Sequence, residues 1–235
     1  MESTVAEQLP DAVVFDFDGL IFDSETPIFR ASADALALLG HDLTIEAWST
    51  VVGHGDADGW AALQVAVGAE VDRLAYDDAY AAQDRSWRDT QPALPGVVVL
   101  LDALHGAGVP CGVASSSPAA WIEGHLARLG LRDRFATIAS EDRVGGRAKP
   151  APDTYLLACA DLGADPARSV ALEDSSPGIA AARAAGLTVV AVPSEITRHT
   201  DLSAAHLAVA SLEHLTLAEL ADLVAHTADP SSELG

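Results

Sequence analysis

Two aspartates, Asp16 and Asp18, follow residues 12–15, an apolar run whose β-branched and aromatic side chains are typical of a buried strand. Side chains two positions apart on a strand point to the same face, so both carboxylates can enter one pocket. Open α/β sheets bind their ligands at the carboxyl ends of strands, where this pair would lie. Two negative charges so close repel each other unless a cation or a shared proton offsets them. The pair therefore predicts a reaction centre that needs a metal ion.

A run of three serines follows the apolar residues 111–114, and Pro118 after it is predicted to begin a helix. A hydroxyl at a strand end, beside the amides of a helix start, is well placed to bind an anion. We therefore expect Ser115 to contact a bound anion and Ser117 to serve only as the N-cap of the helix.

Lys149 is the only lysine of the chain, which otherwise uses arginine for its positive charge. Pro150 keeps Lys149 out of the helical conformation, and Pro152 suits the first turn of a following helix. Lys149 is therefore expected on a stiff, extended segment just before a helix. By itself this pattern fits a solvated surface charge as well as a functional cation.

Two adjacent acids, Glu173 and Asp174, end the apolar run of residues 170–172. Carboxylates at the end of a buried strand are uncommon as ordinary surface charges, and their oxygens suit Mg²⁺. Ser176 and Pro177 after them are expected to be the N-cap and the first residue of a helix. All these polar strand ends would meet along one edge of a parallel sheet, so a single site is predicted.

The elements that must position these residues alternate between helix and strand from residue 97 onward. Helices are predicted at residues 97–107, 118–129, 152–162, 177–185 and 216–226. Strands are predicted at residues 12–16, 109–115, 135–139, 169–173 and 188–192, and a short apolar run covers residues 207–210. This alternation predicts an α/β fold, a Rossmann-like parallel sheet with helices on both faces.

Residues 24–92 lack any strand signal and are predicted to form an inserted, all-helical domain. The first helix of this insertion should begin at Thr26. Four later glycines are expected to break the remaining helices: Gly53, Gly55, Gly59 and Gly68. The sequence thus predicts two domains, an α/β core of residues 1–23 and 93–235 and a helical cap of residues 24–92.

Acidic residues outnumber basic ones by 35 to 13, which gives a formal net charge of −22 at pH 7. Nucleic acids and anionic membranes are therefore not expected as partners, since both need basic patches. Cys111 and Cys159 lie in apolar contexts, so a disulfide is not expected. Residues 1–10 do not resemble a signal peptide, and no apolar run approaches the ~18 residues of a membrane span, so a cytoplasmic location is expected.

Four motifs of the chain, taken in order, resemble those of the haloacid dehalogenase superfamily: Asp16-Phe17-Asp18-Gly19, Ser115, Lys149-Pro150 and Glu173-Asp174. The helical insertion between the first two motifs is similar to that of the branch containing beta-phosphoglucomutase-like phosphatases. The resemblance covers residues 11–225. It implies a Mg²⁺-dependent phosphatase that hydrolyses small phosphorylated metabolites, such as sugar phosphates, through an aspartyl-phosphate intermediate.

The resemblance also implies a role for each residue of the site. Asp16 would be the nucleophile, and Asp18 would protonate the leaving oxygen and then accept a proton from water. The phosphate oxygens would be bound by Ser115, Ser116 and Lys149. The Mg²⁺ ion would be held by Asp16, the backbone carbonyl of Asp18 and Asp174, with Glu173 as a further ligand or as an organiser of the water around the ion.

Residues of the cap bear on the choice between a phosphatase and a phosphomutase of the beta-phosphoglucomutase type. Ile28 and Asp56 stand where that mutase carries a histidine and an arginine, which favours the phosphatase. His54 is expected to contact the substrate from a glycine-flanked loop, although a solvated loop explains it equally well. A receiver-type signalling domain also combines acids, a hydroxyl and a lysine, but it is shorter and leaves the cap unexplained. The oligomeric state stays open between a monomer and a weak homodimer.

Overall fold

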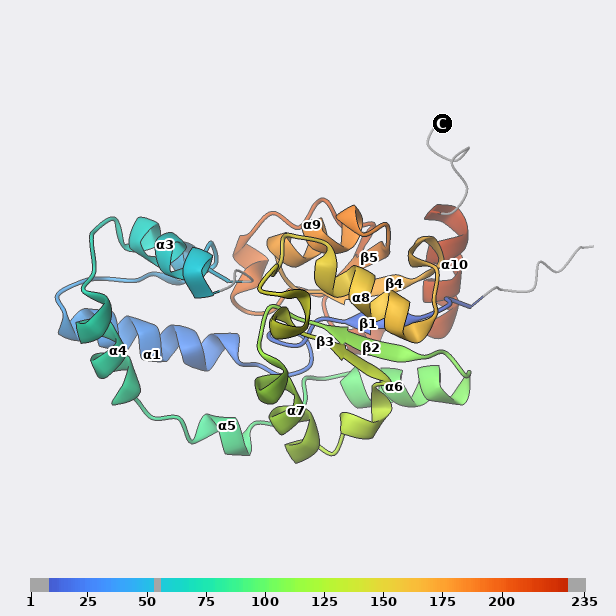
Figure 1. The fold of residues 1–235 in the computed structure, drawn as a ribbon, viewed down its shortest axis with the longest axis horizontal. Helices are drawn as coiled ribbons and strands as arrows, with labels where there is room; N and C mark the ends of the chain where they lie inside the picture. The colour runs from blue at the N-terminus through green and yellow to red at the C-terminus, as the bar shows by residue number, and fades with distance from the viewer. Residues whose placement is uncertain (1–8, 53–55, 228–235) are drawn as a thin grey trace, which may run out of the picture.

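The computed structural model of the chain describes residues 9–52 and 56–227. Six strands form one sheet in the order β3-β2-β1-β4-β5-β6, and every neighbouring pair is parallel (Figure 1). The strands are β1 (Val13–Phe15), β2 (Cys111–Ala114), β3 (Thr137–Ala139), β4 (Val170–Glu173), β5 (Thr188–Ala191) and β6 (Leu207–Ala208). The predicted Rossmann-like parallel sheet is confirmed, and each strand is slightly shorter than its apolar run.

The register of the central strand brings the polar strand ends together. Phe15 of β1 is aligned with Val113 of β2 on one side and with Leu172 of β4 on the other. Asp16 and Glu173 come directly after two of these aligned residues, and the serine run follows β2. All three segments therefore leave the sheet at the same edge.

Helices cover both faces of the sheet, as predicted. Val13 and Phe15 of β1 belong to one hydrophobic cluster and Val14 belongs to another, because alternate side chains of a strand point to opposite faces. The first cluster contains side chains of α6 (Val97–Gly106), α7 (Ala119–Arg128) and α10 (Leu217–Thr227). The second contains side chains of α8 (Asp153–Leu162) and α9 (Ser176–Ala184), which lie across the sheet from α6 and α7 in Figure 1.

The helical insertion lies between β1 and α6, and its described residues form five helices and no strand. They are α1 (Glu25–Leu38), α2 (Ile45–Trp48), α3 (Asp56–Val67), α4 (Arg73–Ala81) and α5 (Trp87–Thr90). Most of a third hydrophobic cluster belongs to the insertion, and Ile196 of the segment after β5 joins it. Tyr76 of α4 donates a hydrogen bond to Ser32 of α1 at 2.9 Å. Figure 1 shows α3 and α4 at one end of the molecule, away from the sheet, and α1 running between that end and the sheet. The helical insertion is confirmed, while its boundaries at residues 24 and 92 stay a prediction.

Two details of the insertion differ from the prediction. α1 begins at Glu25 rather than at Thr26, because the Asp23 carboxylate accepts a hydrogen bond from the Thr26 amide at 3.0 Å and satisfies the first turn. Gly59 lies inside α3 and does not break it, since one glycine costs a helix only about 1 kcal/mol. None of the described helices is both long enough and apolar enough to cross a lipid bilayer.

Candidate active site

The carboxyl ends of β1, β2 and β4 border a pocket that also reaches the first cap helix. Its lining residues come from all of these elements: Asp16, Asp18, Glu25, Ile28, Val52, Ser115, Ser116, Ser117, Trp121, Lys149, Asp174 and Ser175. The structure thus brings together most of the residues that the sequence predicted for the site. Glu173 lies beneath this surface and is fully buried, and His54 lies outside the described residues.

Lys149 is a buried cation at the centre of the site rather than a solvated surface charge, since only 3% of it is exposed. Its Nζ donates hydrogen bonds to Asp16 Oδ1 and, at 2.6 Å, to Glu173 Oε1. It also lies 5.1 Å from the centre of the Tyr155 ring, a distance typical of a cation–π contact. Burial alone would lower the pKa of Lys149, but the two carboxylates reverse this effect and raise it.

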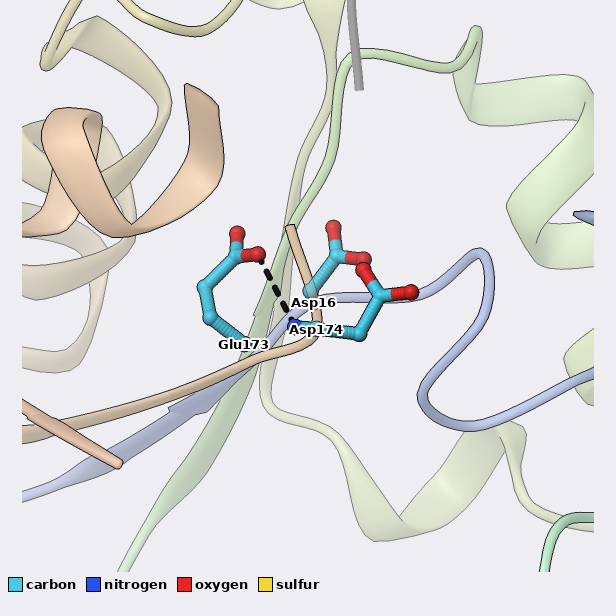
Figure 2. A group of neighbouring side chains, drawn as sticks. All are labelled: Asp16, Glu173 and Asp174. Carbon is cyan, nitrogen blue, oxygen red and sulfur yellow. Dashed lines mark hydrogen bonds between the residues drawn. The ribbon is translucent and has the colours of Figure 1, made fainter. Parts of the chain in front are cut away.

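Three carboxylates meet beside Lys149: those of Asp16, Glu173 and Asp174 (Figure 2). One oxygen of each lies within 4.8 Å of the others, and all three residues are buried. Burial raises the pKa of Asp16 to about 7, with Lys149 opposing the rise and Glu173 adding to it. Burial and the neighbouring carboxylates also raise the pKa of Asp174 well above its ordinary value. One ammonium group does not balance three buried carboxylates, so a divalent cation fits beside the hard oxygen donors of Asp16 and Asp174.

Protein donors occupy both oxygens of Glu173. Oε1 accepts hydrogen bonds from Lys149 and, at 2.7 Å, from the Tyr155 hydroxyl. Oε2 accepts from the amides of Asp174 and Ser175 and from the Ser175 hydroxyl, at distances of 3.1, 3.2 and 3.1 Å. A carboxylate offers about four lone-pair sites, so these donors leave none for an ion. The pattern favours Glu173 as an organiser of Lys149 and of the turn between β4 and α9 over Glu173 as a direct metal ligand.

The start of α9 differs from the prediction by one residue. Ser175, and not Ser176, is the N-cap, and its hydroxyl accepts a hydrogen bond from the Gly178 amide at 3.3 Å. The Ser176 hydroxyl instead donates to the Asp201 carbonyl at 2.6 Å. Gly178 packs so closely against Glu173 that a Cβ atom at position 178 would lie 1.9 Å from Oε1. The first turn of α9 therefore packs directly against the Glu173 carboxylate and fixes its position.

The expectation that Ser117 is only an N-cap is wrong. Pro118 takes the N-cap position of α7 in an extended conformation, and the Ala119 amide donates to Asp142 Oδ1 at 3.1 Å. The Asp142 carboxylate thus accepts the hydrogen bond from the helix start that the sequence predicted for the Ser117 hydroxyl. The Ser117 hydroxyl donates to Asp18 Oδ2 at 2.6 Å instead.

Asp18 accepts hydrogen bonds from three segments that are far apart in the chain. Ser24 Oγ donates to Oδ1 at 2.6 Å, and Trp121 Nε1 donates to the same oxygen at 2.9 Å. Ser117 serves Oδ2, so the carboxylate is held from the start of α1, from the loop after β2 and from α7. The two aspartates after β1 therefore have different surroundings: Asp16 faces an ammonium group, and Asp18 faces two hydroxyls and an indole.

Four residues of the site were not identified from the sequence: Ser24, Trp121, Tyr155 and Thr197. Thr197 contacts the acidic cluster, since its Oγ1 donates to Asp174 Oδ2 at 3.3 Å. Trp121 lies in the first turn of the helix that follows the serine run, and this closeness along the chain could have marked it. Tyr155 and Thr197 carry no such signal, because nothing close to them in the chain indicates that they reach the sheet edge.

Glu25, the first residue of α1, lines the pocket from the cap side together with Ile28 and Val52. Burial raises the pKa of Glu25 to about 8, and the carboxylates of Asp18 and Asp16 add to the rise. A carboxyl group with this pKa is mostly protonated at neutral pH, so it can donate a hydrogen bond as well as accept one. The cap side of the pocket thus presents one polar group between two apolar side chains.

Comparisons with known proteins agree with this arrangement. A family model for haloacid dehalogenase-like hydrolases matches residues 10–186. Hexitol phosphatase B of Escherichia coli K12 is 35% identical over 214 residues, which are 89% of this chain and 96% of that protein. Fructose-1-phosphate phosphatase YqaB of the same strain is 34% identical over 186 residues, 77% of this chain and 95% of that protein. A HAD family hydrolase from Deinococcus radiodurans R1, crystallised with bound phosphate and sodium, matches with a TM-score of 0.74 and 30% identity over 92% of this chain and 98% of that one.

Proposed function

Since the chain belongs to the haloacid dehalogenase-like hydrolase family, we propose that it is a magnesium-dependent phosphatase of sugar phosphates and similar small phosphate monoesters. The observation that carries this proposal is the contact between Asp16 and Lys149 at a pocket that Asp174 also lines. The enzyme class, a phosphoric monoester hydrolase, follows from the phosphatases among the relatives. The names of two of those relatives, for hexitol and fructose 1-phosphate, support the substrate class.

In the proposed first step, a carboxylate oxygen of Asp16 attacks phosphorus while the bond between phosphorus and the leaving oxygen breaks. The leaving oxygen receives a proton from Asp18, so the products are an alcohol and an aspartyl-phosphate. In the second step, water attacks this phosphorus while the bond between phosphorus and the Asp16 oxygen breaks, and the water gives a proton to Asp18. Inorganic phosphate leaves, and both aspartates return to their starting states.

Charge and hydrogen-bond donors of the pocket would stabilise the phosphoryl oxygens in both steps. Lys149 carries three N–H groups, of which Asp16 and Glu173 accept two, so one is left for phosphate. Ser115 Oγ accepts a hydrogen bond from the Ser117 amide at 3.0 Å, which leaves the Ser115 hydroxyl proton for a phosphate oxygen. Ser116 also lines the pocket, and we propose that its backbone amide is a further donor.

The magnesium ion would be held by Asp16, the backbone carbonyl of Asp18 and Asp174. When bound, it would offset the repulsion between these carboxylates and the phosphate. Glu173 would act through Lys149, because its oxygens already accept hydrogen bonds from protein donors. The cap would supply Glu25 and its apolar neighbours to the leaving group, and His54 stays a prediction for the same role.

A phosphate-release screen over phosphorylated metabolites, including hexitol phosphates and fructose 1-phosphate, tests the proposal. We expect sugar phosphates to release phosphate in the presence of Mg²⁺, because an acidic pocket binds a phosphate monoester only when cations offset its own charge. A chelator should reduce the release to background, and excess Mg²⁺ should restore it. Full activity after chelation and dialysis would contradict the metal requirement. Conversion of a hexose 1-phosphate to its isomer without free phosphate would support the phosphomutase instead.

Gly178→Ala tests the organising role proposed for Glu173. The added methyl group would lie 1.9 Å from Glu173 Oε1 and 2.1 Å from Oε2, so the carboxylate must shift from the position in which it accepts the Lys149 hydrogen bond. We expect kcat/KM for phosphate release to fall by at least about tenfold, since a small misplacement of a charged group weakens transition-state contacts. Chemical denaturation should show a free energy of unfolding that is lower by about 1–3 kcal/mol.

Gly124→Ala is the matched control. Gly124 also lies inside a helix, α7, but a Cβ atom there would have nothing within 4 Å. The substitution should leave kcat/KM unchanged and raise the free energy of unfolding by about 0.5–1 kcal/mol, because alanine restricts the unfolded chain more than glycine does. Equal kcat/KM values for Gly178→Ala and Gly124→Ala would contradict the proposed role of Glu173 as an organiser of the site.

A further inference from the structure

We infer that Trp121 is a positioning residue that orients Asp18 for proton transfer to the leaving group; this inference rests on the proposed phosphatase function. The indole Nε1 donates a hydrogen bond to Asp18 Oδ1 at 2.9 Å, and Trp121 lines the same pocket as Asp16 and Lys149. The bond joins residues that are 103 positions apart, so it exists only because α7 packs beside the sheet edge.

The chemistry of the donor distinguishes Trp121 from the other partners of Asp18. The hydroxyls of Ser24 and Ser117 can donate or accept hydrogen bonds, so either could reverse its role when the carboxyl group gains or loses a proton. An indole N–H can only donate. Oδ1 therefore accepts this hydrogen bond whether or not Asp18 is protonated, which favours Oδ2 as the oxygen that carries the proton.

The surroundings of Trp121 hold its ring in one orientation. His125 lies one helical turn further along α7, and its ring centre is 4.3 Å from that of Trp121 in an edge-to-face arrangement. The ring centre of Trp87 lies 6.3 Å from that of Trp121 in an edge-to-face arrangement, and the Arg88 guanidinium lies 5.2 Å from the centre of the Trp121 ring. Trp87 and Arg88 belong to α5, the last helix of the insertion. The Trp121 indole therefore lies between α5 and Asp18.

Trp87 provides a matched control within the same aromatic group. Its ring stacks on Phe22 at 5.9 Å and contacts Trp121, so its packing role is comparable. Among the hydrogen bonds of the described residues, Trp87 has none to Asp18, whereas Trp121 has one. Loss of packing alone should therefore affect both tryptophan variants, while loss of the donor affects only one.

The test compares substrates that differ in their need for a general acid. An alkyl phosphate, such as a hexitol phosphate, leaves as an alcohol and needs a proton from Asp18, whereas 2,4-dinitrophenyl phosphate leaves as a stable anion. The parameter is kcat/KM, which covers the steps through departure of the leaving group and excludes later hydrolysis of the aspartyl-phosphate. We expect Trp121→Phe to lower kcat/KM about tenfold for the alkyl phosphate and less than about twofold for the dinitrophenyl ester. Trp87→Phe should change both values by the same factor.

A second variant separates the N–H group from the shape of the ring. Trp121→benzothienylalanine replaces the N–H by sulfur and keeps the bicyclic outline, so the aromatic packing is preserved. It should show the same substrate-dependent loss as Trp121→Phe. Equal losses on both substrates, or no loss on either, would overturn the inference. A wild-type protein that releases phosphate from neither ester would overturn the proposed function instead.

Discussion

Asp16→Asn is expected to abolish phosphate release, with turnover lowered by at least about 10⁴-fold, because a neutral amide does not attack phosphorus. Asparagine has the shape of aspartate, and its side-chain oxygen can still accept the hydrogen bond that Lys149 donates to Asp16. The loss should therefore reflect chemistry and not a changed site. The measurement is steady-state kcat on the substrate with the highest activity in the screen.

The same substitution should leave the fold at least as stable as before. Burial raises the pKa of Asp16 from 3.8 to about 7, so above pH 7 the ionised side chain lowers the stability of the folded protein. Asparagine removes this penalty. In buffer with a chelator, the variant should be more stable than the wild type at pH 8, and its advantage should shrink as the pH falls from 7 towards 4. Urea denaturation of both proteins at pH 8 and at pH 4 measures the difference in their free energies of unfolding.

Asp34→Asn is the control for Asp16→Asn, since Asp34 is an exposed residue of the cap helix α1. It should change neither turnover nor the dependence of stability on pH. Near wild-type turnover in Asp16→Asn would exclude Asp16 as the nucleophile. A loss of stability at pH 8 would show that the folded site favours the ionised form of Asp16 after all.

Lys149→Met should combine a large loss of activity with a large loss of stability. Lys149 is buried between Asp16 and Glu173, so its removal leaves two buried carboxylates without their shared cation. Breaking a buried ion pair from one side costs about 3–5 kcal/mol of unfolding free energy. Loss of a charged donor to the transferred phosphate should lower kcat by about 10²–10³-fold. Phosphate release and urea denaturation measure the two effects separately.

Lys149→Arg separates the charge of this residue from its shape. The guanidinium keeps the positive charge, but it is a planar fork, and the ammonium group lies in a buried slot 5.1 Å from the Tyr155 ring centre. We expect less loss of stability than in Lys149→Met, but still about a 10²-fold loss of kcat/KM. Arg147→Lys, at an exposed side chain that pairs with Asp153, should change neither quantity. Full activity in Lys149→Arg would place Lys149 away from the phosphate.

The order of helices and strands followed from the sequence because each signal is local. The apolar run before Asp16 predicted a strand, and β1 ends at Phe15. The alternation after residue 97 predicted helices on both faces of a parallel sheet, and the division of β1 between two hydrophobic clusters agrees. Such patterns depend only on neighbouring side chains, so they predict helices and strands without knowledge of the rest of the fold.

Helix starts were predicted less well, because distant groups can satisfy the first amides of a helix. The Ala119 amide donates to Asp142, which lies 23 positions away, and this leaves Ser117 to contact Asp18. The N-cap of α9 is Ser175 rather than the predicted Ser176, and the Ser175 hydroxyl contacts both the Gly178 amide and Glu173. The local preference for serine at an N-cap held for α9 but did not decide which serine would be used, and at α7 the N-cap is Pro118.

By itself the sequence determined which chemical groups this protein brings to one sheet edge: the aspartates after β1, the serines after β2, the single lysine and the two acids at the end of β4. Only the tertiary structure decided which hydrogen-bond partners each of these groups has. Asp16 lies 133 positions from Lys149, and Trp121 lies 103 positions from Asp18. These hydrogen bonds depend on the register of β1 between β2 and β4. Tertiary contacts alone bring Tyr155 to Glu173 and Trp121 to Asp18, because packing between helices and sheet, and not spacing along the chain, sets which donors reach a buried carboxylate.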